Sequence, residues 1–310
     1  MEKKLLIAVD GSVYSSNTLH YLEQLFAHLD DIRFHLLCVV TCNPSQTSRE
    51  WLDELDLIST LSHEEQRRFA AAKRFLHDSV ARLKRNGIAP EQVSTEVKIS
   101  MTNPAVEVLK TAREGIFDAL VLGRRGVSKL EELILGSVSS TMFETCHDVP
   151  IWIVDGQVNS RKFLIPVDGS RFTLNAVDHL CFILQNNPYA EITLFHSAAM
   201  FAQTQDLGPG YCNRFLPREW CSDHSGDPDL YFLAPRQMLI HSGFPPERIH
   251  RLETRKGLYP SRQIVRQALI DDFGTIVMGR RDKDIVKGVF GSVTEKVVAM
   301  SVDTAVWIVG

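Results

Sequence analysis

The sequence lacks the features of membrane and nucleic-acid-binding proteins. No apolar run approaches the roughly 20 residues of a membrane span, and the apolar run in residues 1–12, MEKKLLIAVDGS, is too short for a signal-peptide core. With 34 basic and 38 acidic residues and a net charge of -4, the chain has no positive excess for nucleic acid or an anionic membrane. We therefore expect a cytoplasmic protein with neither kind of partner.

The six cysteines are scattered along the chain and never occur as a CxxC pair. A chain of 310 residues can bury a core without disulfides, so we expect reduced thiols. Cys212, Cys221 and His224 are spaced too widely for the close pairs that bind zinc, and they are expected to be unlinked loop residues. His196 ends an apolar run and is expected to be a core histidine with a satisfied ring.

Common catalytic motifs are also missing. The sequence contains no GxxxxGK[ST], no GxGxxG after a strand and no GxSxG. These absences argue against an efficient enzyme of the corresponding classes.

The sequence does contain an internal duplication. KLLIAVDGSVYSSN aligns with KFLIPVDGSRFTLN, LVLGRRG with IVMGRRD, LGSVSS with FGSVTE, and VPIWIVDG with TAVWIVG. The matches keep their order along the chain, which indicates two repeats. We expect domains at residues 1–157 and 158–310.

Each repeat alternates strand and helix patterns. Continuous apolar runs such as residues 4–9 are typical of strands buried on both faces of a parallel sheet. Ser62 and Glu65 have the spacing of a capping box, and Asn103-Pro104 is a helix start. The alternation predicts an α/β fold with two tandem, doubly wound, five-stranded parallel-sheet domains.

Glycines and hydroxyls cluster where such sheets bind ligands, beyond the carboxyl ends of the strands. Asp10 ends the first strand and Gly123 the fourth, while Gly136 opens a helix whose amides would suit a phosphate. Taken singly, these residues could merely end strands and cap helices. As a spaced set that recurs in the second repeat, they favour phosphate binding.

The pattern Gly123-x2-Gly126-x9-Gly136-Ser137, with VDGS after the first strand and PIWIV at the end, resembles the universal stress protein family. The resemblance spans the chain and is to tandem two-domain members of the ATP-binding branch. It implies a Rossmann-like fold of the adenine nucleotide alpha-hydrolase type. It also implies that the end strands pair, so that the halves pack as an internal pseudo-dimer. Asp10 would face the ribose or a bound Mg²⁺. The implied nucleotide-binding residues are Ala8, Asp10, Val39, Leu122, Gly123, Gly126, Gly136, Ser137, Val138 and Ser139.

The second repeat departs from this pattern. Asp282 replaces the middle glycine, and Ser197 stands where Val39 would be expected. A carboxylate repels a phosphate, unless Asp282 folds back onto neighbouring Arg or Lys side chains and mimics the missing ligand. We expect this site to be impaired or empty. Its matching residues are Pro166, Asp168, Gly279, Gly291, Ser292, Val293 and Thr294.

Three functions follow as hypotheses. The leading one is a stress-response regulatory protein that binds ATP, ADP or AMP mainly in its first half, forms a homodimer and has an unidentified protein partner. The alternatives are a slow Mg-dependent ATP hydrolase acting through Asp10, and a nucleotide-free dimeric scaffold. Residues 41–61 and 197–227 are expected at the rim of each site as a lid, an interface or a disordered segment. In each Arg-Arg pair, 124–125 and 280–281, we expect at least one side chain in solvent or in a surface ion pair.

Overall fold

The computed structural model describes residues 1–42, 61–125, 135–199, 212, 214–225, 227, 229–280 and 292–310. By its contacts the chain divides into two compact units, Met1–Ile151 and Trp152–Gly310. Both units are α/β with parallel strands, which confirms the predicted fold class. No helix in these ranges is long and apolar enough to cross a membrane.

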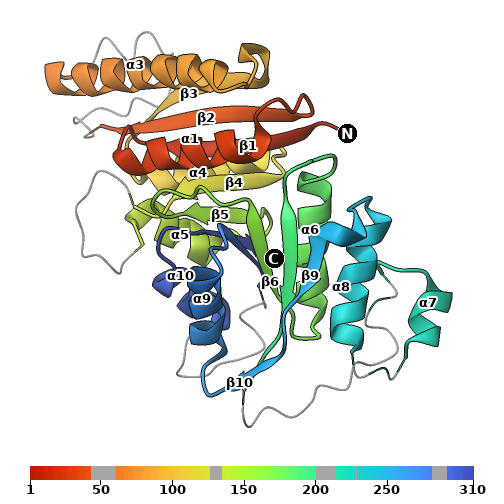
Figure 1. The fold of residues 1–310 in the computed structure, drawn as a ribbon. Helices are drawn as coiled ribbons and strands as arrows, with labels where there is room; N and C mark the ends of the chain where they lie inside the picture. The colour runs from red at the N-terminus through yellow and green to blue at the C-terminus, as the bar shows by residue number, and fades with distance from the viewer. Residues whose placement is uncertain are drawn as a thin grey trace. The chain divides into compact units, whose positions relative to one another are not determined.

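The first unit has the strand order β3-β2-β1-β4 (Figure 1). Strand β1 pairs in parallel with β2 and β4, and β2 with β3. The order reverses between β1 and β4, so their carboxyl ends form a switch point of the kind where ligands bind. The elements are β1 (Lys3–Val9), α1 (Val13–Phe26), β2 (Ile32–Thr41), α3 (His63–Arg85), η1 (Pro90–Gln92), β3 (Val93–Ser100), α4 (Pro104–Glu114), β4 (Ala119–Gly123) and α5 (Ser137–Thr145).

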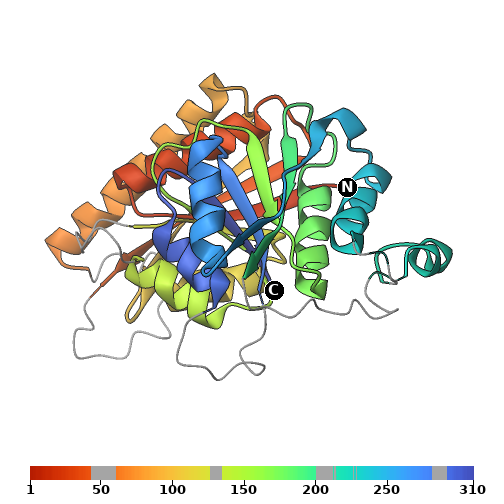
Figure 2. The same cartoon turned by 60° about the horizontal axis from the view of Figure 1, so that its bottom comes forward.

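Sequence patterns account for these elements. The centre of β1, Leu5–Ile7, is fully buried, as expected for a strand covered on both faces. Helix α3 starts at the predicted capping box, in which Ser62 and Glu65 satisfy each other's backbone amides. Helices α1 and α3 pack together, as do α4 and α5, in the two helical layers of this unit (Figure 2).

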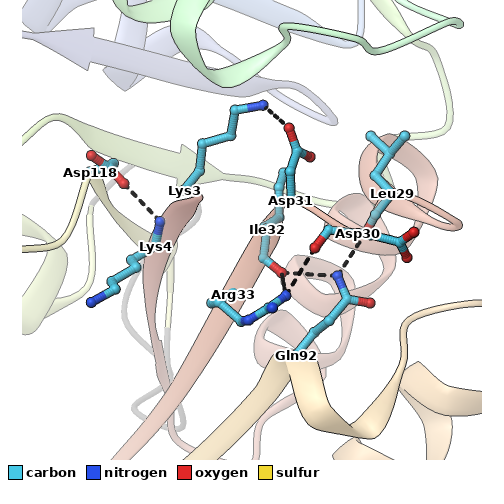
Figure 3. A network of polar contacts seen from close by, with 9 residues as sticks. All are labelled: Lys3, Lys4, Leu29, Asp30, Asp31, Ile32, Arg33, Gln92 and Asp118. Atoms are coloured by element: carbon cyan, nitrogen blue, oxygen red, sulfur yellow. Dashed lines mark hydrogen bonds and ion pairs between the residues drawn. The ribbon is translucent and has the colours of Figure 1, made fainter. Parts of the chain in front are cut away.

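Polar contacts connect the amino-terminal ends of the strands in the first unit (Figure 3). The fully buried Lys3 ammonium donates to the Asp31 carboxylate at 2.5 Å. The Gln92 side-chain amide donates to the carbonyls of Leu29 and Ile32 at 2.7 and 2.9 Å. These contacts tie the starts of β1, β2 and β3 together, which fixes the strand register and hence the positions of the strand ends at the opposite edge.

The second unit has the strand order β5-β12-β11-β6-β7-β9, and β8 and β10 form a separate parallel pair. The unit boundary falls after the first residue of β5 (Ile151–Val154), so the rest of this strand, from Trp152, belongs to the second unit. The other elements are β6 (Lys162–Pro166), α6 (Arg171–Ile183), β7 (Glu191–Phe195), β8 (Ser197–Ala199), α7 (Arg218–Asp223), α8 (Leu230–His241), η2 (Pro246–Arg248), β9 (Ile249–Arg251), β10 (Arg255–Gly257), α9 (Pro260–Ile270), β11 (Thr275–Gly279), α10 (Val293–Met300) and β12 (Ala305–Val309).

Two tryptophans join β5 to β12 inside the second unit. The rings of Trp152 and Trp307 stack with centroids 3.8 Å apart, and the Trp152 indole donates to His179 Nε2 at 3.2 Å. The end strands of the two repeats therefore lie side by side, as the resemblance implies. The domain boundary after residue 157 and the packing of the halves as a pseudo-dimer stay predictions.

Candidate functional site

The carboxyl end of β1 holds Asp10 in a tight turn. Its Oδ1 accepts hydrogen bonds from the Ser12 amide at 3.0 Å and the Ser15 hydroxyl at 2.8 Å. Gly11 has a φ of 78°, a conformation that favours glycine at this turn. The exposed Asp10 carboxylate is thereby fixed just beyond the strand.

The end of β2 lies beside that carboxylate. Burial, with a further contribution from the negative charge of Asp10, raises the pKa of the Cys38 thiol to about 11. Cys38 is paired in register with Val9, and the next residue, Val39, is half-buried. Ala8, also half-buried, is paired with Leu122 of β4, which is buried. The residues expected around an adenosine therefore belong to neighbouring strand ends.

Gly123 ends β4 and has a packing role that the sequence did not reveal. A Cβ at this position would lie 3.3 Å from the Tyr14 Cβ and 3.4 Å from the Thr18 hydroxyl, both on α1. The missing side chain lets α1 pack closely against the strand. Glycine at this position therefore serves the packing of the fold, whether or not a ligand also approaches.

Helix α5 is fastened to this strand end by two hydrogen bonds. The Gly136 amide donates to the Arg124 carbonyl and the Ser139 hydroxyl to the Gly123 carbonyl, both at 2.8 Å. The Ser139 hydroxyl thus holds the helix start against β4, and its contact with a phosphate stays a prediction. Ser137 is exposed and Val138 half-buried at the same helix start. Gly126 lies outside the described residues.

The start of α5 has no side-chain cap among the described residues. Gly136 occupies the N-cap, and the first turn contains no acidic residue. By contrast, α1, α3 and α4 are capped by Ser12, Ser62 and Asn103. Helix α5 therefore offers backbone donors and the positive end of its dipole next to Gly123, at the end of β4.

The neighbouring arginines turn toward the protein. Arg124 and, in the second unit, Arg280 are buried. Arg125 is half-buried, with its guanidinium 5.8 Å from the centre of the Tyr14 ring. Arg124 and Arg280 are therefore not the solvated members of their pairs, and Arg281 lies outside the described residues.

The second unit repeats the turn after its first strand. Asp168, which follows Pro166 of β6, accepts from the Ser170 amide at 2.9 Å and the Thr173 hydroxyl at 2.8 Å. At the end of β11, the Thr294 hydroxyl donates to the Gly279 carbonyl at 3.3 Å, matching the Ser139 contact. The scaffold of the site is thus duplicated.

The helix start of the second unit is capped from within. The Ser292 hydroxyl accepts from the Glu295 amide at 3.1 Å, and the Glu295 carboxylate accepts from the Ser292 amide at 2.9 Å. A negative charge therefore already satisfies the start of α10 at Val293. Sequence reasoning missed this feature, although Ser-x-x-Glu was visible. Asp282 and Gly291 lie outside the described residues.

The rim of the second unit differs as well. Ser197, the counterpart of Val39, is hydrogen-bonded through its hydroxyl to the Gln263 side chain, which also donates to the Lys256 carbonyl at 2.9 Å. These contacts link β8, β10 and α9. His196 is satisfied as expected, with its Nδ1 2.6 Å from the Val167 carbonyl.

The cysteine prediction was wrong for one pair. Cys212 and Cys221 form a disulfide, with their Cα atoms 6.1 Å apart. The turn in which the amides of Phe215 and Leu216 both donate to the Cys212 carbonyl reverses the chain and brings α7 back over Cys212. Spacing alone did not reveal this reversal. The four remaining cysteines are buried and are not part of a disulfide.

The described residues contain no cluster of three or more His, Cys, Asp or Glu side chains suited to a metal ion. Asp10 alone could supply only one carboxylate to Mg²⁺, so the further ligands would have to come from a nucleotide's phosphates or from water.

Comparisons with known proteins agree on one family. Residues 1–155 match the model of the universal stress protein family. The universal stress protein YxiE of Bacillus subtilis (strain 168) is 29% identical over 160 residues, covering 50% of this chain and 99% of YxiE.

Two solved structures resemble the whole chain. A universal stress protein from Archaeoglobus fulgidus DSM 4304 has a TM-score of 0.65 at 20% identity, covering 99% of this chain and 97% of that one. A protein of unknown function from Pseudomonas aeruginosa PAO1 has a TM-score of 0.53 at 14% identity, covering 99% and 92%. At these identities the likeness concerns the fold.

Proposed function

This chain belongs to the universal stress protein family, and we propose that it is a regulatory protein that binds one adenine nucleotide, in its first unit. The phosphates would lie at the start of α5, and the nucleoside would lie along the ends of β1 and β2. Binding would change the surface that a protein partner recognises, which is how a nucleotide could regulate without efficient catalysis.

The observation that carries this proposal is the uncapped start of α5. Every other α-helix described in the first unit has a side-chain cap, whereas α5 begins at Gly136 beside the end of β4. Backbone donors at a helix start bind phosphate well, and each charge-assisted hydrogen bond contributes roughly 1.5–3 kcal/mol. A few such bonds are enough for affinity of about micromolar order after ordering costs.

Asp10 would orient the nucleotide or its Mg²⁺. The Ser12 and Ser15 hydrogen bonds hold one carboxylate oxygen in place, which suits a positioning group. A bound Mg²⁺ would neutralise phosphate charge. Ala8 and Val39 would contact the adenosine, as the family resemblance implies.

The second unit would remain empty. Glu295 already occupies the helix start with a negative charge, and Gln263 engages Ser197 at the rim. We therefore expect one nucleotide per chain, although the scaffold is present twice.

The proposal is tested on the purified full chain. The protein is denatured, released nucleotides are identified by chromatography, and stripped protein is titrated with Mg-ATP in a calorimeter. We expect adenine nucleotide and a stoichiometry of one. Absence of nucleotide together with no heat of binding would instead support a scaffold. Steady ATP turnover that is lost in Asp10→Asn would support the hydrolase.

A further inference from the structure

Strand β3 has one unpaired edge. It is the outer strand of the first unit's sheet (Figure 1), and it pairs with β2 from Val93 to Ser100. Within the described parts of the chain, no strand pairs with its other edge. The strand contains no proline, and most of its residues are half-buried or exposed. An open edge of this kind is a template for another strand.

The hydrogen-bonding groups on that edge can be identified. The Ser100 carbonyl accepts from the Cys42 amide at 2.9 Å and therefore points toward β2. Because successive residues of a strand point their backbone groups to opposite sides, those of Thr95, Val97 and Ile99 point outward.

One acidic and one basic side chain, Glu96 and Lys98, lie between these outward-pointing residues along the strand. The Lys98 ammonium lies 3.6 Å from a Glu96 carboxylate oxygen and donates to the Thr111 hydroxyl of α4 at 2.8 Å. The other Glu96 oxygen lies 3.1 Å from His35 Nε2. Both charged side chains remain partly exposed, at 39% for Glu96 and 25% for Lys98.

We infer that β3 pairs with β3 of a second copy of this chain, antiparallel, about a two-fold axis at Val97. Val97 would then face Val97 of the partner subunit, and Thr95 would face the partner's Ile99. In both pairs the residues can exchange two backbone hydrogen bonds.

The charges select this register. Between the Val97 pair and the Thr95 pair, Glu96 faces the partner's Lys98. This is a pair without backbone hydrogen bonds, in which the side chains of antiparallel strands come closest. A two-fold axis at Glu96 or at Lys98 would instead place like charges opposite each other, which is unfavourable. The partner that fits this edge is therefore another copy of the same strand.

Sedimentation velocity of the full chain over a range of concentrations tests the inference. We expect a reversible dimer, with its dissociation constant raised at least tenfold by Glu96→Lys or by Lys98→Glu. The double exchange should restore the dimer, because it makes the facing charges complementary again. His35→Gln, which removes an intramolecular contact of Glu96 without changing the edge charges, should leave the dimer intact.

Circular dichroism verifies that each variant is folded. A wild-type chain that stays monomeric at all concentrations overturns the inference. So does a dimer that is indifferent to both single reversals, or one that the double exchange fails to restore. These results are independent of nucleotide binding.

Discussion

Transferring the second unit's helix cap to the first is expected to abolish most nucleotide binding. Glu295 and Ser292 satisfy each other's amides at the start of α10, at 2.9 and 3.1 Å. In the aligned repeat, Ser140 and Ser137 occupy these positions. Ser140→Glu therefore gives α5 the Ser-x-x-Glu sequence of α10, which forms a capping box once the N-cap moves one residue, from Gly136 to Ser137.

The expected loss follows from the distances. A phosphate oxygen seeking the same amides would come within about 4 Å of the new carboxylate, where two unit charges repel by about 1 kcal/mol in water and about 4 kcal/mol at a protein surface. The phosphate also loses a charge-assisted hydrogen bond worth roughly 1.5–3 kcal/mol. Allowing for the exposure of the site, we expect a loss of about 2–4 kcal/mol, or roughly 30- to 1000-fold in Kd.

Calorimetric titration with Mg-ATP measures this loss. Ser140→Gln is the matched control, because it has the same shape without the charge, and its loss should be smaller. Glu295→Ser should leave the affinity of the first unit unchanged. The melting temperature of Ser140→Glu should not fall, because a capping box stabilises a helix. Wild-type affinity in Ser140→Glu would refute the placement of the phosphate at α5.

Three further predictions concern a buried histidine, two closely packed glycines and the disulfide. Burial lowers the pKa of His179 from 6.5 to about 3; the unfolded chain binds a proton below pH 6.5 that the folded chain does not. The free energy of unfolding should therefore fall as the pH drops, by about 2 kcal/mol between pH 6.5 and 5. Urea titrations followed by tryptophan fluorescence measure it. If His179→Gln showed the same dependence of unfolding free energy on pH, this assignment would be contradicted. Gly279→Ala should destabilise the fold by roughly 1–3 kcal/mol, because its Cβ would lie 2.1 Å from a backbone oxygen, whereas Gly123→Ala, with contacts of 3.3 Å, should cost less; equal melting temperatures would count against this packing. Thiol titration of unreduced, denatured protein should find four thiols, those of the cysteines outside the disulfide. Six thiols would show that Cys212 and Cys221 are not linked.

The fold was largely readable from the sequence. Buried runs such as Leu5–Ile7, the Ser62 capping box and the Asn103-Pro104 helix start each depend on a few neighbouring residues, and repetition reinforced them. Local patterns of this kind survive in the folded chain because they agree with its packing.

The site was less predictable, because its details depend on residues distant in sequence. Ser139 donates to Gly123, and Gln263 reaches Ser197 from another element. The Cys212–Cys221 link needs a chain reversal that spacing does not encode. Glu295 is different, since its capping box lies within four residues and could have been found.

Hydrogen exchange measured by mass spectrometry, with and without Mg-ATP, shows whether the phosphates of the nucleotide lie at the start of α5. We expect nucleotide to slow exchange in peptides covering Gly136–Ser139 and to leave those covering Ser292–Glu295 unchanged, because the capping box already places the Glu295 carboxylate at the start of α10. Equal exchange at α5 with and without saturating nucleotide, or protection at α10 alone, would contradict this placement.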